Sequence, residues 1–188
     1  MKVKRGGVWQ EPVWRPADNV LRATLPGHLL TWLFDSASLT LRLQQASGGD
    51  FSVRLLSQGW QRPLLSERRA LAMGHHEYGM VRQVQLICRG QPWVYARSVI
   101  PARTLRGAGR QLMRLGSRPL GAFLFAHRGV VREPMEIASV RPGETIYADA
   151  TADLTSPQAS VWGRRSVFRF AQKPLLVSEF FLPSIPAR

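Results

Sequence analysis

Hydrophobic and polar residues alternate along six segments of this chain, and this alternation predicts β-strands. The predicted strands are 51–60, 79–88, 93–100, 130–140, 161–170 and 174–182. Only residues 89–92 separate the second strand from the third, and only 171–173 separate the last two. Such short connections join antiparallel strands, so the pattern predicts two hairpins within an antiparallel sheet.

Apolar residues at helical spacing predict short helices between the strands. The predicted helices are two within 27–46, one at 66–73, one at 104–115 and one at 119–125. We expect Asp35 or Ser36 to cap the second helix, Thr104 to cap the fourth and Gly116 to follow its end. Residues 141–160 show no period and are expected to form a loop.

This order of strands and helices predicts the α+β class, with helices gathered on one face or at one end of the sheet. The length of 188 residues suits a single domain. Residues 1–25 are rich in proline and tryptophan and show no period. We therefore expect an extended N-terminal arm over 1–25 and one domain over 26–188.

The charge of the chain is strongly positive. It carries 26 basic and 12 acidic residues, a net charge of +14. The excess is concentrated in 78–132, which holds ten arginines and no acidic residue. Three explanations are open: a nucleic-acid partner, a small polyanionic ligand, or a solvated basic surface that binds nothing.

Other features of the composition exclude several classes of protein. Cys88 is the single cysteine, which excludes an internal disulfide and any CxxC motif. No apolar run approaches the ~20 residues of a membrane helix. The N-terminus also lacks the apolar stretch of a signal peptide. We therefore expect a cytoplasmic protein without stable membrane insertion.

Two charged residues occupy apolar positions of the predicted strands. Arg82 shares its phase with Met80 and Val84, and Glu179 shares its phase with Val177. An unpaired buried charge costs several kcal/mol, so each side chain needs a partner, a ligand or water. They could form a structural ion pair with each other, or a one-residue error in phase could place both outside. Alternatively, both face one cavity, where the guanidinium binds a carboxylate and the carboxyl group holds a hydroxyl or exchanges a proton.

Arg97 and Leu120 raise similar questions. Arg97 lies in phase with Tyr95 and Val99, and it either extends past the aromatic side chains to water or faces a ligand. Leu120 follows Pro119 at a predicted helix start, where free backbone N–H groups can bind an anion, although a leucine that simply packs explains it equally well.

Signals for metal or nucleotide chemistry are weak. His75, His76 and Glu77 are adjacent, so their side chains diverge, and no third ligand has suitable spacing. The chain has no phosphate-binding glycine motif and no GxSxG elbow. We expect neither a metal nor a cofactor.

Six stretches of sequence form a recognisable set: LLTWLF with SLTLRL, FSVRLLSQGW, VRQVQL with PWVYARSVIP, LGSRPLGAFLF, REPMEIA, and WGRRSVFRFAQKPLLVSEFFLP. Together they resemble the bacterial chorismate pyruvate-lyase family. The resemblance implies a carbon–oxygen lyase that releases pyruvate from chorismate to give 4-hydroxybenzoate for ubiquinone synthesis. It also implies a single α+β domain with six antiparallel strands, helical flaps over an internal site, and no cofactor or metal.

The resemblance implies a role for particular residues. Arg82 corresponds to the arginine that binds the ring carboxylate, and the backbone N–H of Leu120 helps to hold it. Glu179 corresponds to the acid that meets the ring hydroxyl at the opposite end. Leu39 corresponds to an apolar lining position. For the second carboxylate of chorismate, on the pyruvyl group, Arg97 is a candidate.

Two other classes of function compete with this one. The fold also resembles the effector-sensing (UTRA) domains of bacterial transcription regulators, which bind an aromatic or sugar-type effector without turnover. Those domains normally follow a winged-helix DNA reader, for which the 1–25 arm is too short. A nucleic-acid binder would use the arginines, but no motif supports it. We expect a monomer whose ligands are chorismate, 4-hydroxybenzoate and pyruvate, and no nucleic-acid partner.

Overall fold

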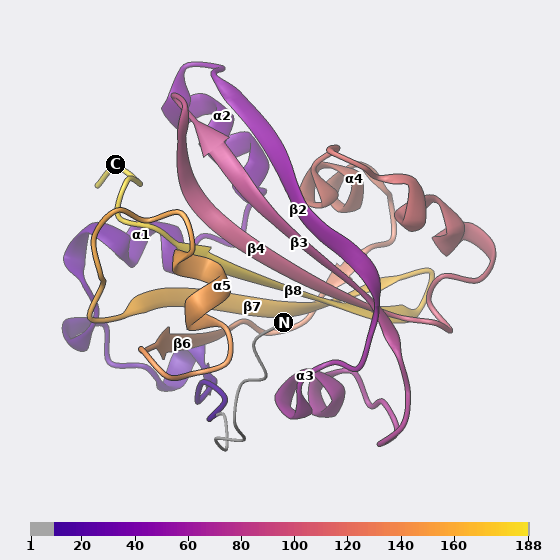
Figure 1. The fold of residues 1–188 in the computed structure, drawn as a ribbon. Helices are drawn as coiled ribbons and strands as arrows, with labels where there is room; N and C mark the ends of the chain where they lie inside the picture. Colours follow the sequence, from indigo (N-terminus) through magenta and orange to yellow (C-terminus); the bar gives the residue numbers. More distant parts are fainter. Residues whose placement is uncertain (1–9, 188) are drawn as a thin grey trace, which may run out of the picture.

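A computed structural model describes residues 10–187, and its strands form one antiparallel sheet (Figure 1). The order is β1-β6-β7-β8-β4-β3-β2, and β5 also pairs with β7. The strands are β1 (Arg15–Pro16), β2 (Phe51–Gln61), β3 (Gly79–Cys88), β4 (Gln91–Pro101), β5 (Val131–Arg132), β6 (Glu136–Val140), β7 (Val161–Phe170) and β8 (Lys173–Phe181). Both predicted hairpins, β3–β4 and β7–β8, are present.

The sheet has eight strands, so the expectation of six is wrong. One additional strand, β1, contains two residues, too few for an alternating pattern to reveal it, and the other arises because one predicted strand is divided. The predicted strand over 130–140 divides at Pro134 into β5 and β6, because proline has no N–H to donate to the ladder. Both pieces remain paired with β7.

The helices are short and lie between the strands. They are α1 (Leu30–Leu33), α2 (Leu39–Ser47), α3 (Leu65–Ala70), α4 (Leu120–Ala126) and α5 (Tyr147–Thr151), with 3₁₀ helices η1 (Ala17–Asn19), η2 (Arg22–Thr24), η3 (Gly27–Leu29) and η4 (Gly107–Arg114). The prediction of a loop over 141–160 is wrong in part, since α5 lies within it.

The expected helix caps are also corrected. Ser38 caps α2 by accepting a hydrogen bond from the Leu41 amide at 3.4 Å, whereas the Asp35 carboxylate is engaged with Arg42. Thr104 does not cap η4, which begins at Gly107, because its buried hydroxyl donates to the Pro174 carbonyl at 2.7 Å.

Helices cover both faces of the sheet, so the expectation of helices gathered on one face or at one end is wrong (Figure 1). Met80 and Val84 point to one face of the sheet, which we name the lid face. Its side chains pack against α1, α2, η4 and α4. We name the other face, to which Val81 and Tyr95 point, the back face. It packs against α5 and the end of α3.

The described part of the predicted arm belongs to the fold. Its strand β1 pairs with β6, and the Ala17 amide donates to the Met135 carbonyl at 2.8 Å. The Glu11 carboxylate accepts hydrogen bonds from the amides of Leu65 and Ser66 at the start of α3. These contacts attach residues 10–17 to the sheet and to the back face. A boundary at residue 25 stays a prediction.

No helix of residues 10–187 is long and apolar enough to cross a membrane.

Candidate functional site on the lid face

Arg82 lies in the middle of β3 and points to the lid face. It is 2% exposed, and its Nη2 donates to the carbonyl oxygens of Gly116 at 2.8 Å and Arg118 at 3.0 Å, just before α4. Its Nε is buried and has no partner among the described residues. Burial lowers the pKa of Arg82 to about 10. The guanidinium is therefore held by backbone acceptors, with one buried donor left for an anionic partner.

Glu179 lies on β8 and points to the same face. Its Oε2 accepts a hydrogen bond at 2.7 Å from Nε of Arg164, which is directly opposite on β7. The Glu179 side chain is 17% exposed, whereas that of Arg164 is 1% exposed. Arg82 and Glu179 thus do not form an ion pair with each other, and neither side chain lies outside the fold.

The sheet register fixes how the two residues are related. Arg82 is opposite Ser98 on β4, and Ser98 is opposite Val177 on β8. Glu179 is two residues beyond Val177 and is opposite Ala96. Arg82 and Glu179 are therefore separated by two interstrand spacings and by two residues along the strand direction, which places their Cα atoms about 12 Å apart. Between them β4 contributes only the small side chains of Ala96 and Ser98.

The ends of two helices cover this part of the sheet. Leu39 is the first residue of α2, Leu120 is the first residue of α4, and both are buried. The helices are in close contact, because a Cβ added at Gly121 would lie 3.1 Å from the Thr40 hydroxyl. The first N–H groups of a helix have no partner within it, so the start of α4 offers donors near Arg82.

A small cavity lies beneath these two helices. Its lining includes Leu39, Gly121, Arg132, Arg164, Val177 and Glu179. Its volume is about 20 Å³, which is room for about one water molecule. A ring-sized ligand can therefore enter only if α2, α4 or the side chains between them move.

Arg164 is a residue of this site that the alternation argument missed. Besides Glu179, it donates through Nη1 to the carbonyl oxygens of Trp32 and Asp35. It therefore joins the sheet to α1 and to the loop before α2. Arg164 lies in phase with Phe168, so the reasoning that selected Arg82 would also have selected it.

Arg132 is the second missed residue. It donates to the Ser166 hydroxyl and to the Ser36 carbonyl, both at 3.0 Å. Burial, reinforced by the positive charge of Arg164, lowers the pKa of Arg132, and the charge of Glu179 opposes that shift. No ion pair between described residues involves Arg132, so its charge is not neutralised at close range.

Arg97 is not brought together with the other candidates. It lies next to Ser98 on β4, so it points to the back face, where its guanidinium binds Glu67 of α3 at 2.7 and 3.1 Å. Both side chains are buried. The structure thus separates Arg97 from Arg82 and Glu179 by the thickness of the sheet.

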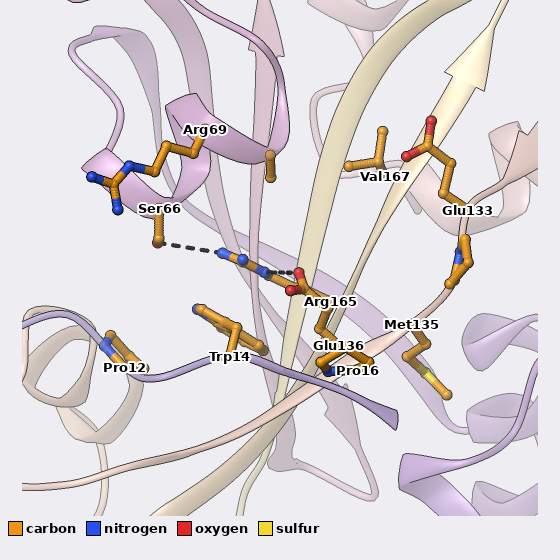
Figure 2. A pocket seen from close by; sticks show the side chains of 12 residues that line it. Pro12, Trp14, Pro16, Ser66, Arg69, Glu133, Met135, Glu136, Arg165 and Val167 are labelled. Carbon is orange, nitrogen blue, oxygen red and sulfur yellow. Dashed lines mark hydrogen bonds and ion pairs between the residues drawn. The ribbon is translucent and has the colours of Figure 1, made fainter. Parts of the chain in front are cut away.

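A more open cavity lies on the back face and has a volume of about 550 Å³ (Figure 2). None of the predicted site residues lines it. Its floor is Arg165, which binds Glu136 at 2.7 Å and Ser66 at 3.3 Å and lies against the Trp14 ring. The other carboxylate of the lining, Glu133, binds Arg169. An arginine engages each carboxylate of this open cleft, so the only charge of its lining without an ion pair among the described residues is that of the exposed Arg69.

Metal ligation finds no support in the part of the chain that the structure describes. No three His, Cys, Asp or Glu side chains lie together there. The His75 ring contacts the guanidinium groups of Arg62 and Arg68, two positive charges that oppose a bound cation.

Comparison with known proteins decides the family. A family model described as chorismate lyase matches residues 8–188. The chain belongs to the chorismate lyase family. A relative from Methylococcus capsulatus, named "Probable chorismate pyruvate-lyase", is 43% identical over 82% of this chain and 94% of its own length. A relative of the same name from Pseudomonas putida is 42% identical over 83% of this chain and 80% of its own length.

Solved structures with a similar fold are transcription regulators. PhnF from Mycobacterium smegmatis has a TM-score of 0.57 at 14% identity, covering 80% of this chain and 65% of that one. A GntR-family regulator from Bacillus cereus has a TM-score of 0.52 at 9% identity, covering 71% of this chain and 92% of that one. At this identity the likeness concerns the fold alone, and it is compatible with the α+β architecture of the chorismate lyase family.

Proposed function

We propose that this protein is a chorismate pyruvate-lyase, which converts chorismate to 4-hydroxybenzoate and pyruvate, the first committed step of ubiquinone synthesis. Family membership supports the reaction class. The observation that carries the proposal is the placement of Arg82 and Glu179 on one face, with only small side chains of β4 between them. This arrangement suits an aromatic acid with a carboxylate at one end and a hydroxyl at the other.

The carboxylate end of the ring is assigned to Arg82 and Leu120. An incoming carboxylate would accept from the buried, unpartnered Nε of Arg82 and from the backbone N–H of Leu120 at the start of α4. It would also compensate a charge that burial now leaves without an anionic partner. Leu39 would pack against the ring from α2.

The hydroxyl end is assigned to Glu179. Arg164 occupies Oε2, and among the described residues no hydrogen bond is made to Oε1. An ionised carboxylate only accepts hydrogen bonds, so Oε1 would accept from the ring hydroxyl and fix the ring in position. Arg164, in turn, holds the carboxylate and acts as a positioning residue.

The reaction breaks two bonds of the substrate. The C–H bond at the ring carbon that carries the hydroxyl is lost, and so is the C–O bond to the enolpyruvyl group. The proton ends on the methylene carbon of the leaving group, which becomes the methyl group of pyruvate, and the ring becomes aromatic. Fixing both ends of the ring favours the geometry in which this transfer takes place.

Arg132 replaces Arg97 as the residue assigned to the second carboxylate of chorismate. It lines the same small cavity as Glu179 and makes no ion pair with a described residue. Arg97, by contrast, is on the back face and is neutralised by Glu67. We assign the pyruvyl carboxylate to Arg132 because it is the cation without a carboxylate partner nearest the hydroxyl end.

The proposal includes a monomeric, cytoplasmic enzyme that needs no cofactor, with residues 26–188 as the catalytic domain. The direct test is to incubate the purified protein with chorismate and to measure pyruvate with a coupled assay and 4-hydroxybenzoate by chromatography. Equal amounts of both products are expected. A protein that binds aromatic acids but forms neither product would be a sensor and not a lyase.

A further inference from the structure

The segment between β4 and β5, residues 102–130, carries a concentrated positive charge that the proposed reaction does not use. We name this segment the basic lobe. Its exposed arginines are Arg106, Arg110, Arg114, Arg118 and Arg128. The lobe contains no acidic residue, and no ion pair between described residues involves any of these five side chains. They form a positive surface without internal compensation.

The local structure turns these charges outward. In η4, Gly109 and Leu112 are buried, and Leu115 after it is buried as well, a spacing of three that matches the three residues per turn of a 3₁₀ helix. The intervening positions, which include Arg110 and Arg114, are therefore directed away from the sheet. Figure 1 shows the coil of η4 at the outer end of the fold, beside α4.

Apolar side chains are exposed between the arginines. Met113 is 39% exposed on η4, and Phe125 is 47% exposed on α4. A partner that is only anionic would gain nothing from these two groups. A surface that combines negative charge with an accessible apolar layer would contact both kinds of side chain.

We propose that the basic lobe docks on an anionic phospholipid bilayer. The arginines would contact the headgroups, and Met113 would enter the boundary between headgroups and acyl chains. The exposed Met113 favours a bilayer over a nucleic acid, since a nucleic acid is bound by phosphate contacts and by stacking on aromatic rings, and a methionine side chain provides neither. Because α4 covers part of the candidate site, the docked protein would present this part of the cover to the membrane.

The test measures binding directly and does not depend on catalytic activity. The full-length protein is sedimented with phosphatidylcholine vesicles that contain phosphatidylglycerol, and separately with vesicles of phosphatidylcholine alone. Binding is expected only to the anionic vesicles, and it should decrease when the ionic strength is raised from about 0.1 M to about 0.5 M.

Matched variants locate the surface. Arg110→Gln with Arg114→Gln should lower the partition coefficient about 30-fold, since each arginine near an anionic surface contributes about fivefold. Arg69→Gln with Arg141→Gln removes the same charge from exposed arginines outside the lobe and should change it less than about threefold. Met113→Ser leaves the charge unchanged and should lower the partition coefficient about threefold or more.

Three results of the vesicle experiments would overturn the proposal, and a competition experiment adds a fourth. The three are equal binding to neutral and anionic vesicles, no binding to either at low ionic strength, and an equal loss in both double variants. Duplex DNA serves as a competitor, and a preference for DNA over the vesicles would assign the lobe to a nucleic acid instead. Chorismate turnover, measured without vesicles, decides the proposed function separately.

Discussion

Glu179 and Arg164 face each other across β8 and β7, with the carboxylate 2.7 Å from a guanidinium that is almost completely buried. On the back face, Arg165 of β7 binds Glu136 of β6 at the same distance of 2.7 Å. The two neighbouring arginines of β7 therefore hold one carboxylate on each side of the sheet. This symmetry provides an internal control for the proposed role of Glu179.

Glu179→Gln should lower kcat/KM for chorismate at least 30-fold, because a neutral amide holds the ring hydroxyl less strongly than a carboxylate does. Glu136→Gln also weakens one ion pair of β7, but it should leave kcat/KM within about twofold. Steady-state kinetics of both variants, with thermal unfolding as a check on the fold, make the comparison. An equal loss of activity in both variants would show that the role of Glu179 is structural.

Arg82→Ala should weaken 4-hydroxybenzoate binding and lower turnover by 30-fold or more, which corresponds to about 2–3 kcal/mol for a charge-assisted contact. Arg82→Lys keeps the charge but not the planar fork, and it should recover only part of the affinity. Calorimetric titration with the product provides the measurement. Near-normal affinity in Arg82→Ala would contradict the assignment of the ring carboxylate.

Arg132→Met should raise KM for chorismate about tenfold or more and leave the affinity for 4-hydroxybenzoate nearly unchanged. The reason is that the product lacks the pyruvyl carboxylate assigned to Arg132. Arg169→Met, which removes a half-exposed arginine paired with Glu133, is the matched control and should change neither constant. If Arg132→Met weakened product binding as much as it raised KM, Arg132 would not be specific to the pyruvyl group.

Gly163→Ala should destabilise the protein by about 2 kcal/mol or more, because the added Cβ would lie 2.5 Å from the Phe180 ring and 3.0 Å from the Glu179 carbonyl. The melting temperature should fall by about 4–8 °C. Gly59→Ala is the control, since no atom lies within 4 Å of its added Cβ, and its melting temperature should not fall by more than about 2 °C. Scanning calorimetry of the three proteins tests the contrast.

Cys88 should make stability sensitive to alkaline pH. Burial raises the pKa of the Cys88 thiol from 9.0 to about 11, so the folded state holds this proton more tightly than the unfolded chain does. The contribution is complete below pH 9, and it is lost as the pH rises to about 11. Urea unfolding across this range should show a steeper decline for the wild type than for Cys88→Ala. Parallel declines would show that the thiol does not titrate differently in the two states.

The sequence predicted the six long strands because alternation is a local property that each strand shows by itself. It could not reveal β1, whose two residues contain no period, and it joined β5 and β6 into one strand across Pro134. The helix α5 was missed for a related reason, since its five residues are too few for a helical pattern and its packing depends on distant residues.

The candidate site was predicted in part. Alternation identifies a charge in an apolar phase, and it selected Arg82 and Glu179 correctly as residues directed into the fold. Alternation does not show to which face of the sheet the residues of one phase point. Arg82 and Arg97 gave the same signal, yet they point to opposite faces, because the register of the β3–β4 hairpin sets that choice and a shift of one residue reverses it.

The neighbouring arginines of β7 also bear on how the chain avoids misfolding. If β7 slipped by one residue against β8, Arg165 would replace Arg164 beside Glu179, and charge alone would hardly distinguish the two alignments. Shape does distinguish them. In the native alignment the one residue of β7 without a side chain lies against the Phe180 ring, whereas a slip would bring Trp162 or Arg164 to that place. A slip would also turn every side chain of β7 to the other face of the sheet, so the fit at Gly163 and the distribution of side chains between the two faces together select the alignment of a strand whose charges are nearly degenerate.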